Sequence, residues 1–385
     1  MKILYVTALM ETINAFLLPH IQMLLDEGNT VECACNINRD INKQLIDSNV
    51  KVNNIDFDRN PKKINYKKVI KEIKMLQENN KYDIIHVHTP IAAFLTRFAL
   101  RKYNCKIIYT AHGFHFYKGA SLLNWLIYYP LEKIAARWTD IIITINKEDY
   151  INCKKFKLRD KESKVKLIHG VGIDLNKYKS LNKEIKLNKR KELNLSEEDF
   201  IIIMIADLNK NKNQIQLIKA IELLNHKYSR IKAILVGNGP IKEYLKDEIQ
   251  NRNLNENIKL LGFRTDVNEL INISDIGVLL SYREGLPRNI MELMANGKRI
   301  IATNIRGCRD LVCNDNVGTL VKVGDFEETA EAIERYYLNS KSIEGVDEDC
   351  KFNSSEYGIS YIESYDIKNV VEELKSIYSY LNSII

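Results

Sequence analysis

The chain contains 385 residues, of which 45% are apolar. That length exceeds one ordinary hydrophobic core and fits two domains, and the apolar content excludes an intrinsically disordered chain. The 57 basic and 50 acidic residues leave a net charge of +7. This surplus comes without an RNA-recognition, zinc-finger or helix-turn-helix signature, so nucleic acid is excluded as an expected partner.

Short apolar runs alternate with longer amphipathic stretches through the amino-terminal half. Runs rich in Ile and Val with this spacing are typical of buried parallel strands joined by helices. The predicted strands are KILYVT, TVECAC, YDIIHVH, CKIIYTA, DIIITI and KVKLIHG. No small-residue cleavage site follows the first run, so we expect a core strand there and not a signal peptide. The longest apolar runs are about seven residues, well short of the roughly 20 that cross a bilayer.

A lysine-rich segment follows the second predicted strand. Between Lys62 and Lys74 six lysines accompany one glutamate, and the apolar residues Ile64, Val69, Ile73 and Met75 are set among the lysines. Two interpretations fit this pattern. The lysines belong either to a helix face that is solvated, or to an interfacial helix that lies on an anionic membrane.

Histidines lie within the third predicted strand and directly after the fourth, where an aromatic segment also begins. His86 and His88 share one strand face, and with His112 and His115 they could suggest a metal cluster. No acidic ligand accompanies them, so we predict no metal site. The aromatic and basic segment 114–138 fits an acceptor surface near a membrane and a buried helix equally well.

A polar, lysine-rich connector separates the two halves of the chain. We place the end of the first domain at residue 185, and the strand rhythm returns beyond it. The second set of predicted strands is FIIIMIA, IKAILVG, NIKLLG, DIGVLLS, KRIIATN and GTLVKV. The sequence therefore predicts two doubly wound domains, at 1–185 and 186–358, followed by an amphipathic helix within 359–385.

The stretch EGLPRNIME, residues 284–292, follows the carboxyl end of the strand DIGVLLS. Pro287 suits the first turn of a helix that Gly297 would end, and the amides at such a helix start attract anions such as phosphate. Helical spacing turns Arg288 and Glu292 away from the buried face. Their charges fit either a solvated helix face or a site in which a carboxylate accepts hydrogen bonds from a diol.

These two glutamates, in the pattern E-x7-E, occur with the motifs LGFRTDV, LVGNGP, LNKNKNQ and YTAHGFH. Together they resemble the retaining glycosyltransferases of family four, which have the GT-B fold. The resemblance spans nearly the whole chain, and the motifs come in the family's order. It implies an α/β fold of two Rossmann-like domains that face a cleft, with the C-terminal helix returning to the first domain.

The resemblance assigns donor-binding roles to the stretch EGLPRNIME. Glu284 would hold the sugar and Glu292 the ribose diol of the nucleotide. The backbone between them would approach the diphosphate, at Gly285, Leu286, Arg288 and Asn289. Pro287 stands where many members of the family have glycine, which removes one N–H donor, and Arg288 is a candidate to compensate for it.

Two further segments supply candidates for binding the diphosphate. In LNKNKNQ, Lys212 matches the family's lysine. Asp207 occupies the position of the family's arginine, which reverses a charge, and Lys210 is a candidate substitute because a lysine is a flexible point charge.

The motifs LVGNGP and LGFRTDV complete the donor site that the resemblance implies. Gly237, Asn238 and Gly239 follow a strand and turn toward the cleft. Phe263 and Arg264 match the segment that lies beside the nucleobase. Without the resemblance, Phe263 fits a core position equally well.

His112 matches the histidine that faces the sugar–phosphate junction from the first domain. Departure of a nucleoside diphosphate develops negative charge, which preorganised donors stabilise. The resemblance thus makes His112, Lys212 and Glu284 the candidate catalytic residues. The chain departs from the family in lacking a GG loop after the first strand. The acids Asp347 to Asp349 look like a metal-binding DxD motif, but we expect a solvated loop there.

The resemblance implies an enzyme that transfers a sugar, with retention, from a nucleotide donor onto a glycan or lipid-linked acceptor in bacterial surface polysaccharide synthesis. We expect a UDP-linked donor and no metal or cofactor. The alternatives are a UDP-sugar epimerase of the same fold and a non-catalytic nucleotide-sugar-binding protein. The seven cysteines form no CxxC pair and are odd in number, which favours a reducing cytoplasm. Peripheral contact with an anionic inner membrane face fits this setting.

Overall fold

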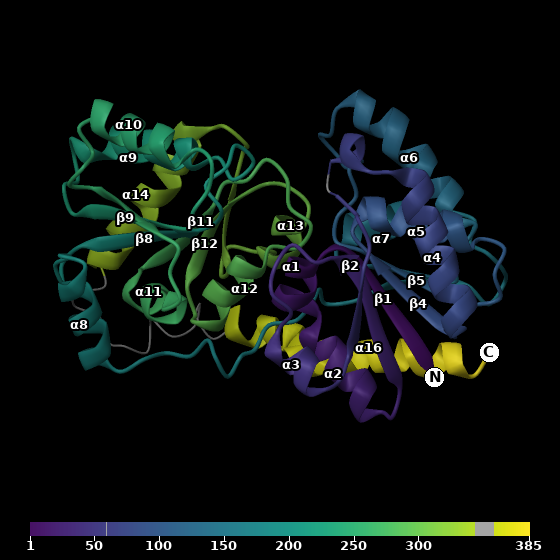
Figure 1. The fold of residues 1–385 in the computed structure, drawn as a ribbon. Helices are drawn as coiled ribbons and strands as arrows, with labels where there is room; N and C mark the ends of the chain where they lie inside the picture. The colour runs from purple at the N-terminus through teal and green to yellow at the C-terminus, as the bar shows by residue number, and fades with distance from the viewer. Residues whose placement is uncertain (59, 343–357) are drawn as a thin grey trace. The chain divides into compact units, whose positions relative to one another are not determined.

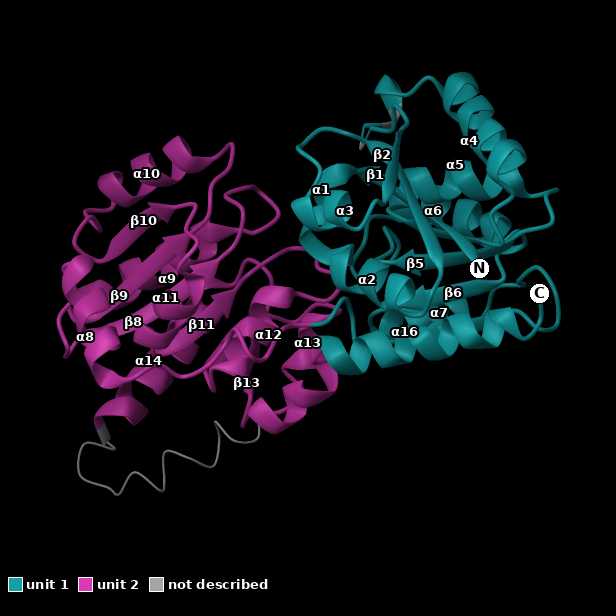
Figure 2. Ribbon diagram, turned by 60° about the horizontal axis from the view of Figure 1, so that its bottom comes forward, with its two compact units in different colours: residues 1–172, 367–385 teal, residues 173–366 magenta. Residues whose placement is uncertain are grey.

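The chain forms two compact units, each with its own parallel sheet (Figure 2). Unit 1 contains residues 1–172 and 367–385, and unit 2 contains residues 173–366. This computed structural model describes residues 1–58, 60–342 and 358–385. The polar connector around residue 185 belongs to unit 2, so the chain passes between the units earlier than that connector. The two sheets confirm the predicted pair of doubly wound α/β domains.

The sheet of unit 1 has seven parallel strands in the order β3-β2-β1-β4-β5-β6-β7. Figure 1 labels β1, β2, β4 and β5 among them. The seven strands are β1 (Lys2–Leu9), β2 (Thr30–Asn36), β3 (Lys51–Asn54), β4 (Ile84–His88), β5 (Lys106–Ala111), β6 (Ile141–Thr144) and β7 (Lys164–Leu167). Six of these strands are the predicted apolar runs. The sequence of β3, KVNN, lacks such a run because an edge strand with partly exposed side chains needs few apolar residues.

Helices connect the strands of unit 1 and complete its core. They are α1 (Met10–Thr12), α2 (Leu18–Asp26), α3 (Lys43–Asp47), α4 (Tyr66–Asn80), α5 (Pro90–Leu100), α6 (Leu122–Ala136), α7 (Lys147–Cys153) and α16 (Ile367–Asn382), with a π-helix at Ile13–Leu17 and a 3₁₀ turn at Pro61–Lys63. The last helix, α16, contacts α2, and the Tyr378 hydroxyl donates to that of Tyr5 at 2.9 Å. The C-terminal helix therefore belongs to the first unit, as the fold class implies.

The sheet of unit 2 has six parallel strands in the order β10-β9-β8-β11-β12-β13. They are β8 (Phe200–Ile205), β9 (Ile231–Val236), β10 (Ile258–Gly262), β11 (Ile276–Leu279), β12 (Arg299–Thr303) and β13 (Gly318–Val321). The helices are α8 (Lys183–Glu192), α9 (Gln214–Asn225), α10 (Lys242–Asn251), α11 (Val267–Ile273), α12 (Arg288–Ala295), α13 (Cys308–Leu311) and α14 (Phe326–Ser342), with a 3₁₀ turn at Glu363–Tyr365. All six strands match predicted runs.

The lysine-rich segment around helix α4 places most of its apolar residues inside the protein. Ile64, just before the helix, and Val69 and Ile73 within it are buried in the hydrophobic core of unit 1, whereas Met75 is 48% exposed. An interfacial helix needs its apolar face free to enter the lipid. The interfacial interpretation of this segment is therefore wrong, and its lysines cover an outward face. In the described ranges, no helix combines the length and the hydropathy needed to span a membrane.

Each sheet contains one point where the strand order reverses. In unit 1 this point lies between β1 and β4, and in unit 2 it lies between β8 and β11. The connections from the two flanking strands leave in opposite directions, which opens a crevice at the carboxyl edge where doubly wound sheets bind ligands. The loops that follow β8 and β11 are therefore the first place to look for a site in unit 2.

Candidate functional site

An ion pair joins the two loops at the reversal point of unit 2. Lys212, in the loop after β8, donates from Nζ to Glu284 Oε1 at 2.6 Å, and Glu284 lies in the loop after β11. The backbone strengthens this junction, because Tyr282 N donates to Asn211 O at 2.8 Å and Asn211 Nδ2 donates to Arg283 O at 3.0 Å. Two residues that the sequence assigned to one site, 72 positions apart, are thus in direct contact.

A further cation, Arg306, contacts the same loop and was not predicted from the sequence. Its side chain is buried, and Nε donates to the carbonyl oxygen of Glu284 at 3.0 Å. Arg306 follows β12, the neighbour of β11, so it reaches the same carboxyl edge of the sheet. A basic residue two positions after the predicted strand KRIIATN was the signal that could have identified it.

Helix α12 starts one residue later than predicted. Pro287 is its N-cap, in an extended conformation and without a side-chain cap, and Arg288 is the first helical residue. Asn289 Nδ2 donates to the carbonyl oxygen of Ile205 at the end of β8, at 2.7 Å. This bond holds the start of α12 at the reversal point. Gly297 follows the helix with a φ of 65°, as a terminating glycine does.

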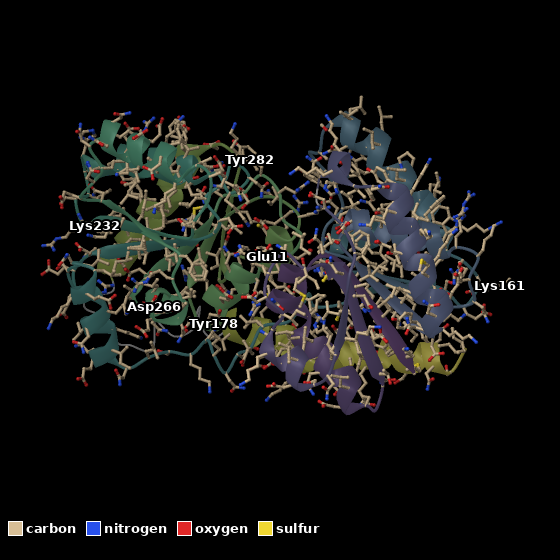
Figure 3. The ribbon with its side chains drawn as sticks, viewed as in Figure 1. Glu11, Lys161, Tyr178, Lys232, Asp266 and Tyr282 are labelled. Carbon is tan, nitrogen blue, oxygen red and sulfur yellow. The ribbon has the colours of Figure 1, made fainter. Side chains whose placement is uncertain are left out.

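Glu292 lies on a buried part of α12, contrary to the prediction that it faces away from the interior. The residue is 9% exposed, and its Oε1 accepts a hydrogen bond from the Tyr178 hydroxyl at 2.7 Å. Arg288 Nε lies 3.3 Å from the same oxygen. Burial raises the pKa of Glu292 above the usual range, although Tyr178 and Arg288 oppose that shift. Tyr178 comes from the segment before α8, and Figure 3 labels it.

Close backbone packing explains why glycine stands at three places around the site. A Cβ on Gly307 would lie 2.2 Å from the carbonyl oxygen of Gly285. Likewise, a Cβ on Gly237 would lie 2.0 Å from Ala206 O, and one on Gly239 would lie 2.2 Å from the carbonyl oxygen of residue 208. These glycines let neighbouring loops approach at backbone distance, so the GxG motif holds the loop that carries Lys212.

The predicted nucleobase segment is only partly free to bind a ligand. Phe263 is 75% exposed, which excludes the core position that it also fitted. Arg264 is engaged by protein carboxylates: its Nε lies 2.7 Å from Asp266 Oδ1, and its Nη2 lies 3.0 Å from Glu192 Oε1. The Arg264 bonds hold the pKa of Asp266 well below its usual range. A ligand that needed the guanidinium would have to compete with these acids.

Three further predicted residues of unit 2 occupy solvent-facing positions on loops of this edge, whereas Leu286 is partly buried against the core. Asp207 and Lys210 are exposed between β8 and α9, and Asn238 is exposed between β9 and α10. Gln214 Nε2 fixes the Asp207 carbonyl at 2.9 Å. The acids Asp347 to Asp349 lie outside the described residues.

His112 of unit 1 belongs to a group of histidines and tyrosines at the carboxyl ends of β4 and β5. His112 Nε2 lies 3.0 Å from His88 Nδ1, and the His88 ring lies 4.2 Å from that of His86 between centroids. His86 contacts the Tyr378 hydroxyl at 2.6 Å and Thr110 Oγ1 at 2.7 Å. Burial lowers the pKa of His112 to about 4 and that of His86 and His88 well below the usual value. All three rings are neutral at pH 7.

His115 does not join this group. Its ring stacks on Tyr128 of α6 at 4.4 Å between centroids. Among the residues that the structure describes, no set of three or more His, Cys, Asp or Glu side chains is arranged to hold a metal ion.

Comparison with known proteins supplies the family. The family model "Glycosyl transferases group 1" matches residues 185–351, and the model "Glycosyl transferase 4-like" matches residues 2–146. The chain is 38% identical over 272 residues to EpsD of Bacillus subtilis (strain 168), named as a glycosyltransferase, covering 70% of this chain and 71% of that protein. It is 29% identical over 316 residues to the UDP-Gal:alpha-D-GlcNAc-diphosphoundecaprenol alpha-1,3-galactosyltransferase of Escherichia coli, covering 81% and 79%.

Solved structures agree on the fold. HepE of Anabaena, crystallised in complex with UDP, superposes with a TM-score of 0.78 at 20% identity, covering 98% of this chain and 100% of that chain. Sucrose-phosphate synthase from Thermosynechococcus elongatus gives a TM-score of 0.79 at 15% identity, with full coverage of both chains. Three findings agree: the two doubly wound parallel sheets, the contact between Lys212 and Glu284, and a glycosyltransferase relative that is 38% identical over 70% of this chain. The chain is an enzyme of the family-four glycosyltransferases with the GT-B fold.

Proposed function

We propose that this glycosyltransferase moves a sugar from a UDP-linked donor to a hydroxyl of a glycan or lipid-linked acceptor, with retention at the anomeric carbon, in surface polysaccharide synthesis. The observation that carries the proposal is the contact between Lys212 and Glu284 at the reversal point of unit 2. A cation and a carboxylate side by side fit a ligand that combines a diphosphate with a polyhydroxylated sugar.

Lys212 would carry the charge that builds up on the leaving UDP. Its ammonium has three N–H donors, so it can keep its bond to Glu284 and also donate to a phosphate oxygen. Glu284 would then accept hydrogen bonds from sugar hydroxyls. The uncapped start of α12 adds backbone N–H donors and the positive end of the helix dipole beside the same loop.

Glu292 would hold the nucleotide ribose while Phe263 stacks on the base. Tyr178 and Arg288 both contact Oε1 of Glu292, and we assign Oε2 to the ribose diol. His112, from unit 1, would donate to the donor near the sugar–phosphate junction. Arg264, which the sequence assigned to the base, instead supports the segment through Asp266.

Retention is proposed to proceed by departure and attack on the same face of the sugar. The Glu284 carboxylate is bound by Lys212, and that of Glu292 is bound by Tyr178 on the buried side of α12. Neither group is presented as a nucleophile. Stabilisation of the leaving diphosphate is then the main catalytic contribution of unit 2.

The relatives support the nature of the donor and acceptor. The E. coli relative is named for a UDP-Gal donor and a diphosphoundecaprenol-linked acceptor, and HepE was crystallised with UDP. Six cysteines at described positions are free thiols, which suits a reducing compartment. We accordingly place the reaction at the cytoplasmic face of a membrane.

Helix α6 offers a surface for that membrane, in place of α4. Three leucines in its first turns, Leu122, Leu123 and Leu126, are 74%, 64% and 65% exposed. Further exposed apolar residues extend this surface along the helix: Ile127, Leu131 and Ile134. The helix begins in the segment after β5 that contains His112, at the edge of the sheet where an acceptor would be used.

The charges around α6 favour an anionic bilayer as its partner. Lys118, Lys133 and Arg137 are exposed, whereas the acid within this stretch, Glu132, is buried and bonded to Arg97 Nη2 at 2.8 Å. Basic residues beside an exposed apolar helix face are the combination that binds anionic lipid surfaces. We define this α6 surface by Leu122, Leu123, Leu126, Ile127, Leu131 and Ile134.

A vesicle-binding experiment tests the α6 surface. The double variant Leu123→Glu/Leu126→Glu should lose at least about tenfold in affinity for phosphatidylglycerol vesicles, because two leucines no longer enter the lipid. Ile151→Glu, at a position of α7 that is 58% exposed, is the control for an added surface charge. Unchanged binding by the double variant would contradict the proposal. Conversion of a dimer to a monomer, seen by light scattering, would assign the surface to self-association instead.

Ligand binding and transfer test the function itself. UDP at 100 times its Kd should add about 2.7 kcal/mol of stability, whereas nicotinamide nucleotides should add none. Lys212→Met should lower kcat/KM for transfer about 100-fold, and Lys246→Met, on the exposed face of α10, should leave it unchanged. Mass spectrometry of the donor distinguishes transfer from epimerisation, because an epimerase changes the donor without any acceptor. NMR of the product reports the anomeric configuration.

A further inference from the structure

We propose that His88 is a positioning residue that fixes the tautomer of His112, so that His112 presents Nδ1–H as a donor. Only the role of this Nδ1–H in sugar transfer rests on the proposed function. The tautomer itself follows from the contacts of the two rings in unit 1.

One hydrogen bond links the two imidazoles. His88 Nδ1 and His112 Nε2 are 3.0 Å apart, and the rings are inclined by only 24°. His88 is 1% exposed and is flanked by the rings of His86 and Tyr5. His112 is half-buried and lies just after β5, at the carboxyl edge of the sheet. Such a bond between neutral rings needs one N–H donor and one lone-pair acceptor.

The other nitrogen of His88 decides which ring donates. His88 Nε2 is buried and lacks a hydrogen-bond partner among the described residues. If His112 donated, the proton of His88 would sit on this Nε2 as a buried N–H without an acceptor. If His88 donates from Nδ1, its Nε2 carries only a lone pair. A buried acceptor without a partner is more common in proteins than a buried donor without one, so we infer that His88 is the donor. His112 must then carry its own proton on Nδ1.

This arrangement makes His112 a neutral donor. Its Nδ1–H can be offered to an oxygen of the sugar or diphosphate without a change of charge during the reaction. In the opposite tautomer, Nδ1 would turn a lone pair toward the same oxygens and repel them. A preorganised N–H directed at developing negative charge stabilises the transition state.

Nuclear magnetic resonance tests the tautomer in the full-length protein without any substrate. Histidine labelled with ¹⁵N gives separate signals for protonated and bare ring nitrogens, and His112→Gln identifies the His112 signals by their loss. We expect a protonated Nδ1 and a bare Nε2 for His112. A protonated Nε2 overturns the proposal.

A pair of variants at position 88 tests the consequence for catalysis. His88→Asn places an amide N–H near the position of Nδ1 and should keep both the tautomer and kcat. His88→Leu, of similar size, has no donor, so the His112 signals should average between tautomers and kcat should fall about tenfold with little change in KM. Equal kcat for the two variants overturns the positioning role, provided that thermal unfolding shows both to be folded.

The two experiments separate this inference from the proposed function. If the spectra show Nδ1–H but His112→Gln transfers sugar at the wild-type rate, the tautomer assignment stands and the proposed role of His112 fails. If His112→Gln is impaired while His112 carries its proton on Nε2, the role of His112 stands and the inference about His88 fails.

Discussion

At the scale of single residues, Glu292 is a buried carboxylate whose desolvation is partly offset by a hydrogen bond from the Tyr178 hydroxyl. Desolvation raises its pKa, while the Tyr178 hydroxyl and Arg288 stabilise the ionised form. Removing one member of a buried hydrogen bond leaves the other unsatisfied, which costs more than removing both. Glu292 is therefore expected to contribute to folding as well as to donor binding.

Substitution of Glu292 should separate these two contributions. Glu292→Ala should lower the free energy of unfolding by about 1–3 kcal/mol, because the Tyr178 hydroxyl loses its acceptor, and it should weaken UDP binding measured by calorimetry. Tyr178→Phe removes the hydroxyl and keeps the carboxylate, so UDP affinity should be retained. In the double variant the loss of stability should be smaller than the sum of the two single losses. Additive losses would show that the bond contributes nothing to folding.

The sequence predicted the position of Glu292 on α12 but not its surroundings. The apolar spacing of the helix identifies the face that packs on its own sheet. It cannot indicate that Tyr178, 114 residues earlier, covers a second part of the helix. Arg306 was missed for a similar reason: its place just after a predicted strand is visible in the sequence, but its contact with a backbone carbonyl of a neighbouring loop is not.

At the scale of elements, the loop after β8 and the loop after β9 are held together by backbone contacts. Leu208 N donates to Asn238 O at 2.9 Å, and Gly237 has a φ of 144°. The loop that carries Lys212 is therefore positioned by its neighbour and not by side chains alone.

Substituting alanine for Gly239 should disturb the contact between the loops after β8 and β9. Its Cβ would lie 2.2 Å from the Leu208 carbonyl oxygen, a contact that only a backbone shift can relieve. We expect Gly239→Ala to lose about 1–3 kcal/mol of stability and to weaken UDP binding, because the shift moves the Lys212 loop. Gly358→Ala, where a Cβ meets no atom within 4 Å, is the control. Wild-type UDP affinity in Gly239→Ala would show that the loop tolerates the shift.

Element prediction from the sequence succeeded where burial imposes a pattern and failed where it does not. Twelve strands with apolar runs were identified, and the polar edge strand β3 was missed. The sequence offered two candidates for a membrane-facing helix, α4 because of its lysines and the aromatic segment 114–138, yet Val69 and Ile73 of α4 are in the core. In α6 the leucines remain exposed. Whether an apolar stripe faces the core or the solvent depends on tertiary neighbours, which the spacing alone does not reveal.

At the scale of the whole molecule, the two units differ in how they should respond to acid. Unit 1 contains four buried or half-buried histidines whose pKa values are lowered by desolvation: His20, His86, His88 and His112. The values for His20 and His112 fall to about 4. Both tryptophans, Trp125 and Trp138, also lie in unit 1, so tryptophan fluorescence reports its unfolding.

Unit 1 should lose stability as the pH falls from about 6.5 to about 4. Above pH 6.5 these histidines are neutral in the folded and unfolded chains, so they add no pH dependence. Below it the unfolded chain binds protons that these four histidines exclude in the folded chain, which costs roughly 1 kcal/mol per histidine for each pH unit. His169, whose pKa is raised by its bond to Glu373, acts in the opposite direction and offsets part of this loss. Urea unfolding followed by tryptophan fluorescence at pH 7 and pH 5 should therefore show a clear drop in midpoint. His88→Asn has one such histidine fewer, so its urea midpoint should change less between pH 7 and pH 5. Equal midpoints of the wild-type protein at the two pH values would mean that the histidines become charged without unfolding unit 1.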